Sequence, residues 1–210
     1  GGYYKIYHKE NPKKLSNETD SQNYNEKVTT NNEPKVDSYG YRDLSELPQD
    51  YSMKQAIDDG CIVITYNEIY GKDKLEKIIE NTRVNSQERK EDKIRIVQST
   101  VEGDLIIKDL EYKKEEKQDG CLDMEKTGYI LTVDNTRDKF SADEDRKITV
   151  DNDIPGVFYG IIKQEKDDDI HIVLVLYAQI DYVSGDGKIY KDIEVCSYPK
   201  RLENTNSNIN

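Results

Sequence analysis

The sequence predicts an α+β domain in which two N-terminal helices pack on one face of a mostly antiparallel sheet of about six to eight strands. Three observations predict this fold class. Apolar residues recur at helical spacing between positions 51 and 83. From about position 94 they alternate with a period of two, as in half-buried strands. Turn signals, such as those at 167–169 and 184–187, divide this second part into hairpins.

The apolar residues are concentrated after position 50, which places a single domain at residues 51–200. Residues 1–50 contain six Ile, Leu and Val side chains among Asn, Lys, Glu, Ser and Thr. A segment of this composition cannot bury enough apolar surface to fold. We therefore expect a disordered polar leader at 1–50 and a polar tail at 201–210. Because the chain opens on Gly1 without an initiator Met, we also expect that a targeting segment has been removed.

Two helices are expected at the start of the domain. Ser52 and Gln55 have the spacing of a capping box, and Gly60 provides a stop after the first helix. Asp73 and Glu76 repeat the capping-box spacing. A second, amphipathic helix ending near position 83 is predicted by residues at i, i+3, i+4 and i+7, namely Leu75, Ile78, Ile79 and Thr82.

Strands are expected along the rest of the domain, at 61–65, 94–101, 105–112, 128–133, 147–150, 157–163, 170–183 and 189–195. The segment 170–183 is apolar through most of its first half and should be the central strand of the sheet. The segment 189–195 should return beside it as an edge strand. Glycines 103, 185 and 187 suit hairpin turns, which need positive φ angles.

The net charge of −12 is uneven, since residues 1–50 carry 7 Lys and Arg against 9 Asp and Glu, and the rest carry 24 against 34. A domain this acidic repels phosphate backbones and anionic bilayers. We therefore expect no nucleic-acid partner, and membrane attachment only through a lipid anchor outside this sequence. The expected partner is an unknown envelope protein or ligand, and the expected oligomeric state is a monomer.

No catalytic, cofactor-binding or metal-binding residue is predicted. Nucleophilic catalysis needs a base, and the only histidines are His8, in the leader, and His171, which should lie on the surface of the sheet. Cys61 heads an apolar strand and should be a buried thiol. Cys121 and Cys196 lie in polar contexts, and whether they form a disulfide stays open.

The acidic loop 134–145 is the one segment with a metal-like pattern. Asp134, Thr136 and Asp138 place oxygens at alternate positions, as calcium sites do. However, the sixth position is Lys139 rather than Gly, which excludes an EF-hand. We favour a solvated loop that Phe140 anchors to the core, and a looser calcium site is the alternative.

Four segments carry a family resemblance: YSMKQAI at 51–57, KLEKII at 74–79, DKIRIVQSTVEGDLIIKDLEY at 92–112 and DNTRDKF at 134–140. On these the chain resembles a family of uncharacterised lipoproteins of Bacillus- and Clostridium-type Gram-positive bacteria, known only as a domain of unknown function. The resemblance implies export and anchoring through a lipidated cysteine, but no activity and no cofactor. The shared DNTRDKF segment is either a fold-specifying turn, which we favour, or a common surface.

These observations predict an exported, lipid-anchored or secreted protein at the extracellular face of the cell membrane, acting as a non-enzymatic binding or interaction domain. One alternative is a hydrolase or carbohydrate-active protein that uses carboxylates alone. A pocket with two facing carboxyl groups of raised pKa would favour that enzyme, and an exposed apolar or tyrosine-rich patch would favour binding. A calcium-dependent surface module is the third hypothesis.

Overall fold

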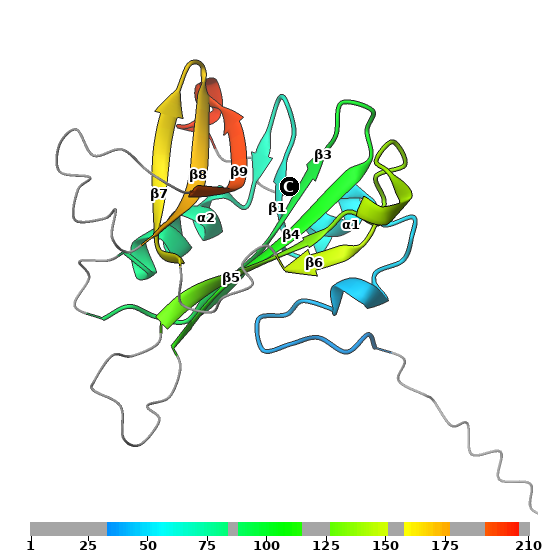
Figure 1. Cartoon of the computed structure of the whole chain (residues 1–210), viewed down its shortest axis with the longest axis horizontal. Helices are drawn as coiled ribbons and strands as arrows, with labels where there is room; N and C mark the ends of the chain where they lie inside the picture. Colours follow the sequence, from blue (N-terminus) through cyan, green and yellow to red (C-terminus); the bar gives the residue numbers. More distant parts are fainter. Residues whose placement is uncertain (1–32, 84–87, 115–126, 151–157, 177–191, 206–210) are drawn as a thin grey trace, which may run out of the picture. The chain divides into compact units, whose positions relative to one another are not determined.

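The computed structural model describes residues 33–83, 88–114, 127–150, 158–176 and 192–205. Within these ranges the fold is mostly β, with nine strands and two α-helices (Figure 1). The helices are α1 (Met53–Asp58) and α2 (Lys72–Asn81). The strands are β1 (Ile62–Ile64), β2 (Ile69–Tyr70), β3 (Asp92–Ser99), β4 (Leu105–Lys114), β5 (Thr127–Asp134), β6 (Ile148–Val150), β7 (Phe158–Lys166), β8 (Asp169–Leu176) and β9 (Asp192–Pro199).

The strands form two sheets, whereas the sequence predicted one. The larger has the order β2-β1-β3-β4-β5-β6, and the smaller has the order β7-β8-β9. All pairings are antiparallel except β1 with β3, which is parallel. The segment 170–183 was predicted as the central strand of the single sheet, and its described part, β8, is instead the central strand of the smaller sheet. β9 lies beside it as an edge strand, as predicted.

The larger sheet buries residues on both faces, and this follows from the alternation of side chains along β3. Ile94 and Ile96 belong to one core cluster, whereas Val97 belongs to another. The first cluster also contains residues of α2 and of the smaller sheet. The second contains Ala56 of α1. The two helices therefore lie on opposite faces of the larger sheet, and the prediction that both pack on one face is wrong.

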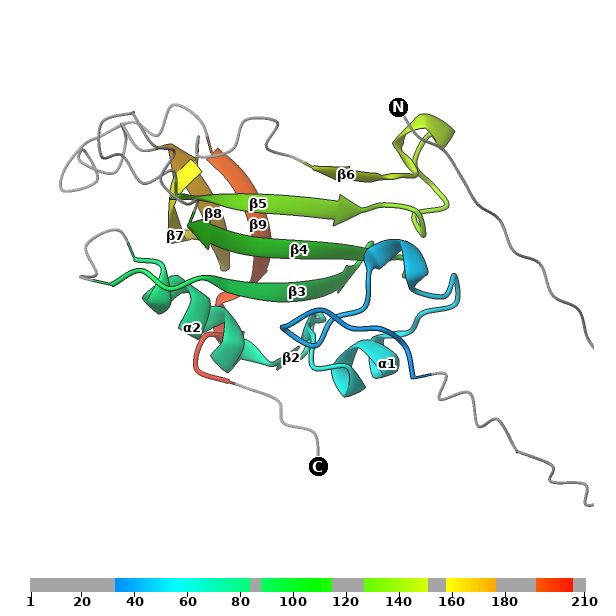
Figure 2. The ribbon, with the colours of Figure 1, turned by 90° about the horizontal axis from the view of Figure 1, so that it is seen from below.

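Residues 34–50, which we name the strap, cover the face that bears α1 (Figure 2). The strap contains one isolated β-bridge, between Val36 and Arg42, and a short 3-10 helix, η1 (Leu44–Glu46). Its side chains at positions 41, 44 and 47 are buried in the second core cluster together with Tyr51. The ordered domain therefore begins near position 34 rather than 51. Residues 1–32 of the predicted leader lie outside the described residues.

The capping motifs in the sequence correctly predicted the start of α1 but not that of α2. Ser52 and Gln55 form the predicted capping box. The second capping box is absent, because α2 begins one residue before Asp73 and Gly71, with a φ of 70°, precedes its first turn. At the other end of the domain, the predicted tail includes the end of the 3-10 helix η3 (Lys200–Leu202), and Leu202 is buried in the first core cluster.

The predicted turns hold where they are described. Gly103 has a φ of 93° between β3 and β4, and Asp167 has a φ of 55° between β7 and β8. The predicted turn at 184–187 lies outside the described ranges. Among the residues described, no helix combines the length and the apolar character needed to cross a bilayer.

If the strap is part of the folded domain, Leu44→Ala should lower the free energy of unfolding by about 2 to 3 kcal/mol, because it leaves a cavity against the sheet. Urea denaturation of the full chain measures the change. Val101→Ala is the matched control, since Val101 is 99% exposed in a turn, and should change stability by no more than about 0.5 kcal/mol. Equal stability of both variants would contradict the packing of the strap.

Candidate functional site

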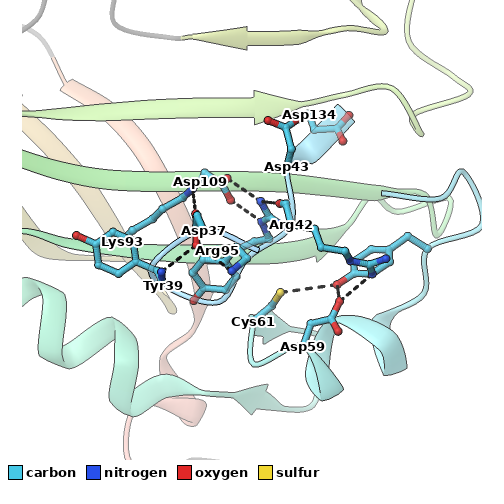
Figure 3. Close-up of polar contacts among 12 residues, drawn as sticks. Asp37, Tyr39, Arg42, Asp43, Asp59, Cys61, Lys93, Arg95, Asp109 and Asp134 are labelled. Atoms are coloured by element: carbon cyan, nitrogen blue, oxygen red, sulfur yellow. Dashed lines mark hydrogen bonds and ion pairs between the residues drawn. The ribbon is translucent and has the colours of Figure 1, made fainter. Parts of the chain in front are cut away.

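A buried ion pair on the strap side of the larger sheet holds the centre of the candidate site (Figure 3). The register of β3 and β4 places Arg95 directly opposite Asp109. Arg95 Nε lies 2.6 Å from Asp109 Oδ1, and Nη2 lies 2.9 Å from Oδ2. The Arg95 side chain is 2% exposed. Nη2 also donates to the carbonyl oxygen of Arg42 at 2.7 Å, so the pair holds the strap against the sheet.

A second cation extends this network toward solvent. Lys93 Nζ lies 2.6 Å from Asp37 Oδ2 and 3.6 Å from Asp109 Oδ2. Both Lys93 and Arg95 lie over the ring of Tyr41, at 5.9 and 5.1 Å from its centroid. Burial alone would raise the pKa of Asp37, but the hydrogen bonds from Lys93 and from two backbone amides lower it below its ordinary value.

A second buried pair fixes the far end of the strap. Asp134, at the end of β5, accepts hydrogen bonds from the backbone N–H and hydroxyl of Thr136 and from Arg137 Nη1 at 2.8 Å. Arg137 Nη2 donates to the carbonyl oxygens of Leu47 and Pro48, at 3.2 and 2.7 Å. The first four residues of the DNTRDKF segment therefore form a turn that binds the strap, which supports the turn interpretation that we favoured.

The structure does not support the other predictions for this loop. Asp134 is engaged by Arg137, and the described residues contain no group of three or more His, Cys, Asp and Glu side chains placed to hold a metal ion. Phe140 is 73% exposed and does not anchor the loop to the core. Asp138 instead orders it by accepting from the backbone N–H groups of Phe140 and Ser141.

Cys61 lies beneath the strap as a buried thiol, as predicted. Its Sγ is 3.9 Å from Tyr51 Oη, which donates to Asp59 Oδ2 at 2.6 Å. Arg42 Nη2 binds the same carboxylate at 3.1 Å. Burial raises the pKa of the Cys61 thiol to about 11, so it remains protonated and unreactive at neutral pH.

The remaining candidates lie far from this network in the fold, on the smaller sheet. His171 contacts Glu194 across β8 and β9 and lies on the surface of the sheet, as predicted. Cys196 is buried in the first core cluster rather than in a polar context, and burial raises its pKa to about 12. Cys121 lies outside the described residues, so its pairing with Cys196 stays open.

An open groove of about 740 Å³ lies between the strap and the strap-side face of the larger sheet. Arg95, Asp109 and Thr132 lie in one cross-strand row on its floor, and Ile148 of β6 lines its far side. The strap contributes the opposite wall. Four cationic and four acidic side chains line the groove: Lys35, Arg42, Lys93, Arg95, Asp37, Asp43, Glu46 and Asp109.

Most of the positive charge in the groove is already compensated. Arg42, Lys93 and Arg95 each form an ion pair with a carboxylate. In contrast, Asp43 and Glu46 on the strap have no ion-pair partner among the described residues. The Asp43 carboxylate accepts hydrogen bonds from the hydroxyl and the backbone N–H of Ser45, and these lower its pKa. Lys35, also on the strap, likewise has no ion-pair partner among the described residues. The rim formed by the strap therefore carries two carboxylates and one ammonium group without ion pairs, beside an apolar edge.

Sequence reasoning missed the residues of this network. Arg95 and Asp109 occupy strand positions whose apolar neighbours were used to predict the strands. The available signal was a cation at the centre of β3 between Ile94 and Ile96, paired in the next strand with a carboxylate before Leu110. The strap itself was missed because its buried side chains follow neither a strand period nor a regular helix.

The fold and the site define a mostly β domain with a groove lined by the strap. One family of proteins matches part of this domain. Residues 58–154 match the model of a family described as "Domain of unknown function (DUF4362)", which spans the end of α1 through β6. This supports the predicted membership of this region in an uncharacterised family of unknown function. No curated protein and no solved structure matches the chain.

The buried pair gives a sharp stability test. Asp109→Asn should lower the free energy of unfolding by about 3 kcal/mol or more, because Arg95 would remain buried without its counter-charge. The double variant Arg95→Met, Asp109→Leu should recover much of the loss, because it buries no charge. Asp58→Asn is the control, since the Lys54–Asp58 pair is exposed and should be worth less than about 1 kcal/mol. Thermal or urea unfolding that shows equal losses for Asp109→Asn and Asp58→Asn would refute this.

Asp37 should make the stability depend on pH in the acid range. Its folded pKa lies below its ordinary value of 3.8, so its stabilising effect is present above pH 3.8 and disappears as the pH falls through the lower folded value. The difference in unfolding free energy between the wild type and Asp37→Asn should therefore be constant at neutral pH and vanish under strong acid. Urea titrations at a series of pH values measure it, and a difference that grows in acid would contradict it.

Proposed function

We propose that this protein is an exported, envelope-tethered binding domain whose binding site is the groove between the strap and the larger sheet. The observation that carries the proposal is an open cavity of about 740 Å³ that combines a polar floor with an exposed apolar edge. The arginine of this floor is already neutralised by its ion pair with Asp109. Ligand sites commonly combine apolar surface with a few fixed polar groups. Its partner is an envelope protein or another envelope component.

The electrostatics of the groove favour binding over carboxylate-based hydrolysis. A general acid must keep its proton near neutral pH, which requires a raised carboxyl pKa. The hydrogen bonds described above lower the pKa values of Asp37 and Asp43 instead. Asp109 accepts two hydrogen bonds from Arg95, so both of its carboxylate oxygens are already engaged within the protein. The groove thus offers fixed charges and apolar contacts rather than a proton donor.

The proposed location rests on the sequence. A polar leader separates the domain from the start of the chain, and the resemblance to uncharacterised Gram-positive lipoproteins implies export and a lipid anchor. The acidic charge of the whole chain disfavours nucleic acid and direct contact with anionic lipids as partners. We propose that the leader carries a monomeric domain away from the membrane surface.

Affinity capture with the full chain as bait tests both the site and the location. Thr132→Arg places a bulky cation on the floor of the groove, at a half-buried position beside Asp109. Val101→Arg adds the same charge at a turn that is 99% exposed. We expect a partner from the envelope fraction of the source cells whose capture falls at least tenfold with Thr132→Arg and is unchanged with Val101→Arg.

Circular dichroism and urea unfolding of both variants check that they are folded. Hydrogen exchange of the complex should show new protection within residues 35–46, which form one wall of the groove. Equal capture by the two variants would overturn the groove as the binding site. Capture from the cytosolic fraction alone would overturn the envelope location.

A further inference from the structure

Strand β6 has an open edge beside the groove. It is the outermost strand of the larger sheet and pairs with β5 on one side (Figure 2). The described residues provide no strand on its other side. The edge of a sheet presents unpaired backbone donors and acceptors, and an extended peptide can add to it.

The register shows which backbone groups are free. Asn135 N–H donates to the carbonyl oxygen of Lys147, so these two residues face each other in the ladder between β5 and β6. Because the direction of backbone groups alternates along an antiparallel strand, Thr149 also faces β5, opposite Val133. The N–H and C=O groups of Ile148 and Val150 consequently point away from β5 and toward the open edge.

The side chains of the same two residues lie on the strap side of the sheet, and that of Ile148 lines the groove. Val150 lies in the cross-strand row of Asp109 and Thr132, and Ile148 lies opposite Asp134. This is the strap side of the sheet. Ile148 is 37% exposed and Val150 is 48% exposed. The edge therefore combines outward backbone groups with one apolar side chain that lines the cavity and a second one on the same side of the sheet.

We propose that β6 accepts an extended basic peptide as an additional strand of the larger sheet; this rests on the proposed function of the groove. In an antiparallel pairing, which we propose here, the peptide residues that hydrogen-bond to Ile148 and Val150 also present their side chains to the groove. A lysine there lays its aliphatic stem along the two apolar side chains. Its ammonium group then extends toward Asp43 and Glu46, the acidic side chains of the same cavity that lack an ion-pair partner within the described ranges.

Charge favours this peptide over a second copy of the chain. The protein carries a net charge of −12, so two copies joined at β6 would bring like charges together. The carboxylates at the rim gain nothing from an acidic partner. A basic segment of another protein instead neutralises them.

The test uses a capped heptapeptide in which lysine alternates with threonine, and a counterpart with glutamate in place of lysine. Titration calorimetry with the full chain should show binding of the lysine peptide and none of the glutamate peptide. Methylating the backbone nitrogens of the lysines should abolish binding, because these nitrogens face β6. Methylating those of the threonines should leave the affinity within about threefold.

Variants of the protein test the edge itself. Ile148→Pro removes an outward N–H that the β5 ladder does not use, so the sheet should fold, and the affinity should fall at least tenfold. Val101→Ala, in a turn that is 99% exposed, is the control and should bind within about threefold of the wild type. Asp43→Asn with Glu46→Gln should weaken binding and flatten its salt dependence, while Asn at position 43 still caps η1.

The outcomes separate this inference from the proposed function. If Ile148→Pro binds the lysine peptide as the wild type does, strand addition is wrong, whereas loss of binding in Thr132→Arg would still support the groove. If no peptide binds, the inference fails, and the capture experiment decides the groove independently. Sedimentation that shows a dimer dissociated by Ile148→Pro would identify a second copy as the occupant and overturn the proposal.

Discussion

The Arg95–Asp109 ion pair determines how the two sides of the domain are joined. It lies where the strap crosses the larger sheet, and its guanidinium binds both a carboxylate of β4 and a carbonyl oxygen of the strap. A buried arginine without a partner would be costly, so the strap carbonyl and Asp109 must both remain in place. Arg137 repeats this arrangement at the other end of the strap, with Asp134 as its carboxylate. Two such contacts position an irregular segment that has little apolar surface of its own.

The strap adds only a few apolar side chains to the core, and these pack directly against the larger sheet. Tyr41, Leu44 and Leu47 bury their side chains against the same core cluster as α1. Tyr41 also provides its ring to the two cations of β3. The strap therefore covers the apolar part of one face of the sheet, whereas the row of Arg95, Asp109 and Thr132 remains as the floor of the groove. The shape of the candidate site follows from where the strap stops covering the sheet.

The sequence was informative where a local rule determines structure. The capping box at Ser52 and the alternation of apolar residues in β3 and β4 predicted real elements. It was less informative where tertiary contacts decide. The strap has a polar composition, and its order depends on Arg95 and Arg137, which lie far from it in the chain. The division into two sheets and the opposite placement of the helices depend on which face of β3 each element covers, and periodicity does not specify this.

The same features also limit what the groove can bind. β6 is only three residues long, and Arg146 and Lys147 precede it, which discourages indiscriminate pairing of edges. So short a ladder gives few backbone hydrogen bonds, and a partner must gain the rest of its affinity from side chains in the cavity. There the floor is already neutralised by internal ion pairs, and the carboxylates without ion-pair partners in the described part of the chain lie on the strap. A ligand selected by this surface therefore needs both an extended backbone and a positive charge at the correct position along it.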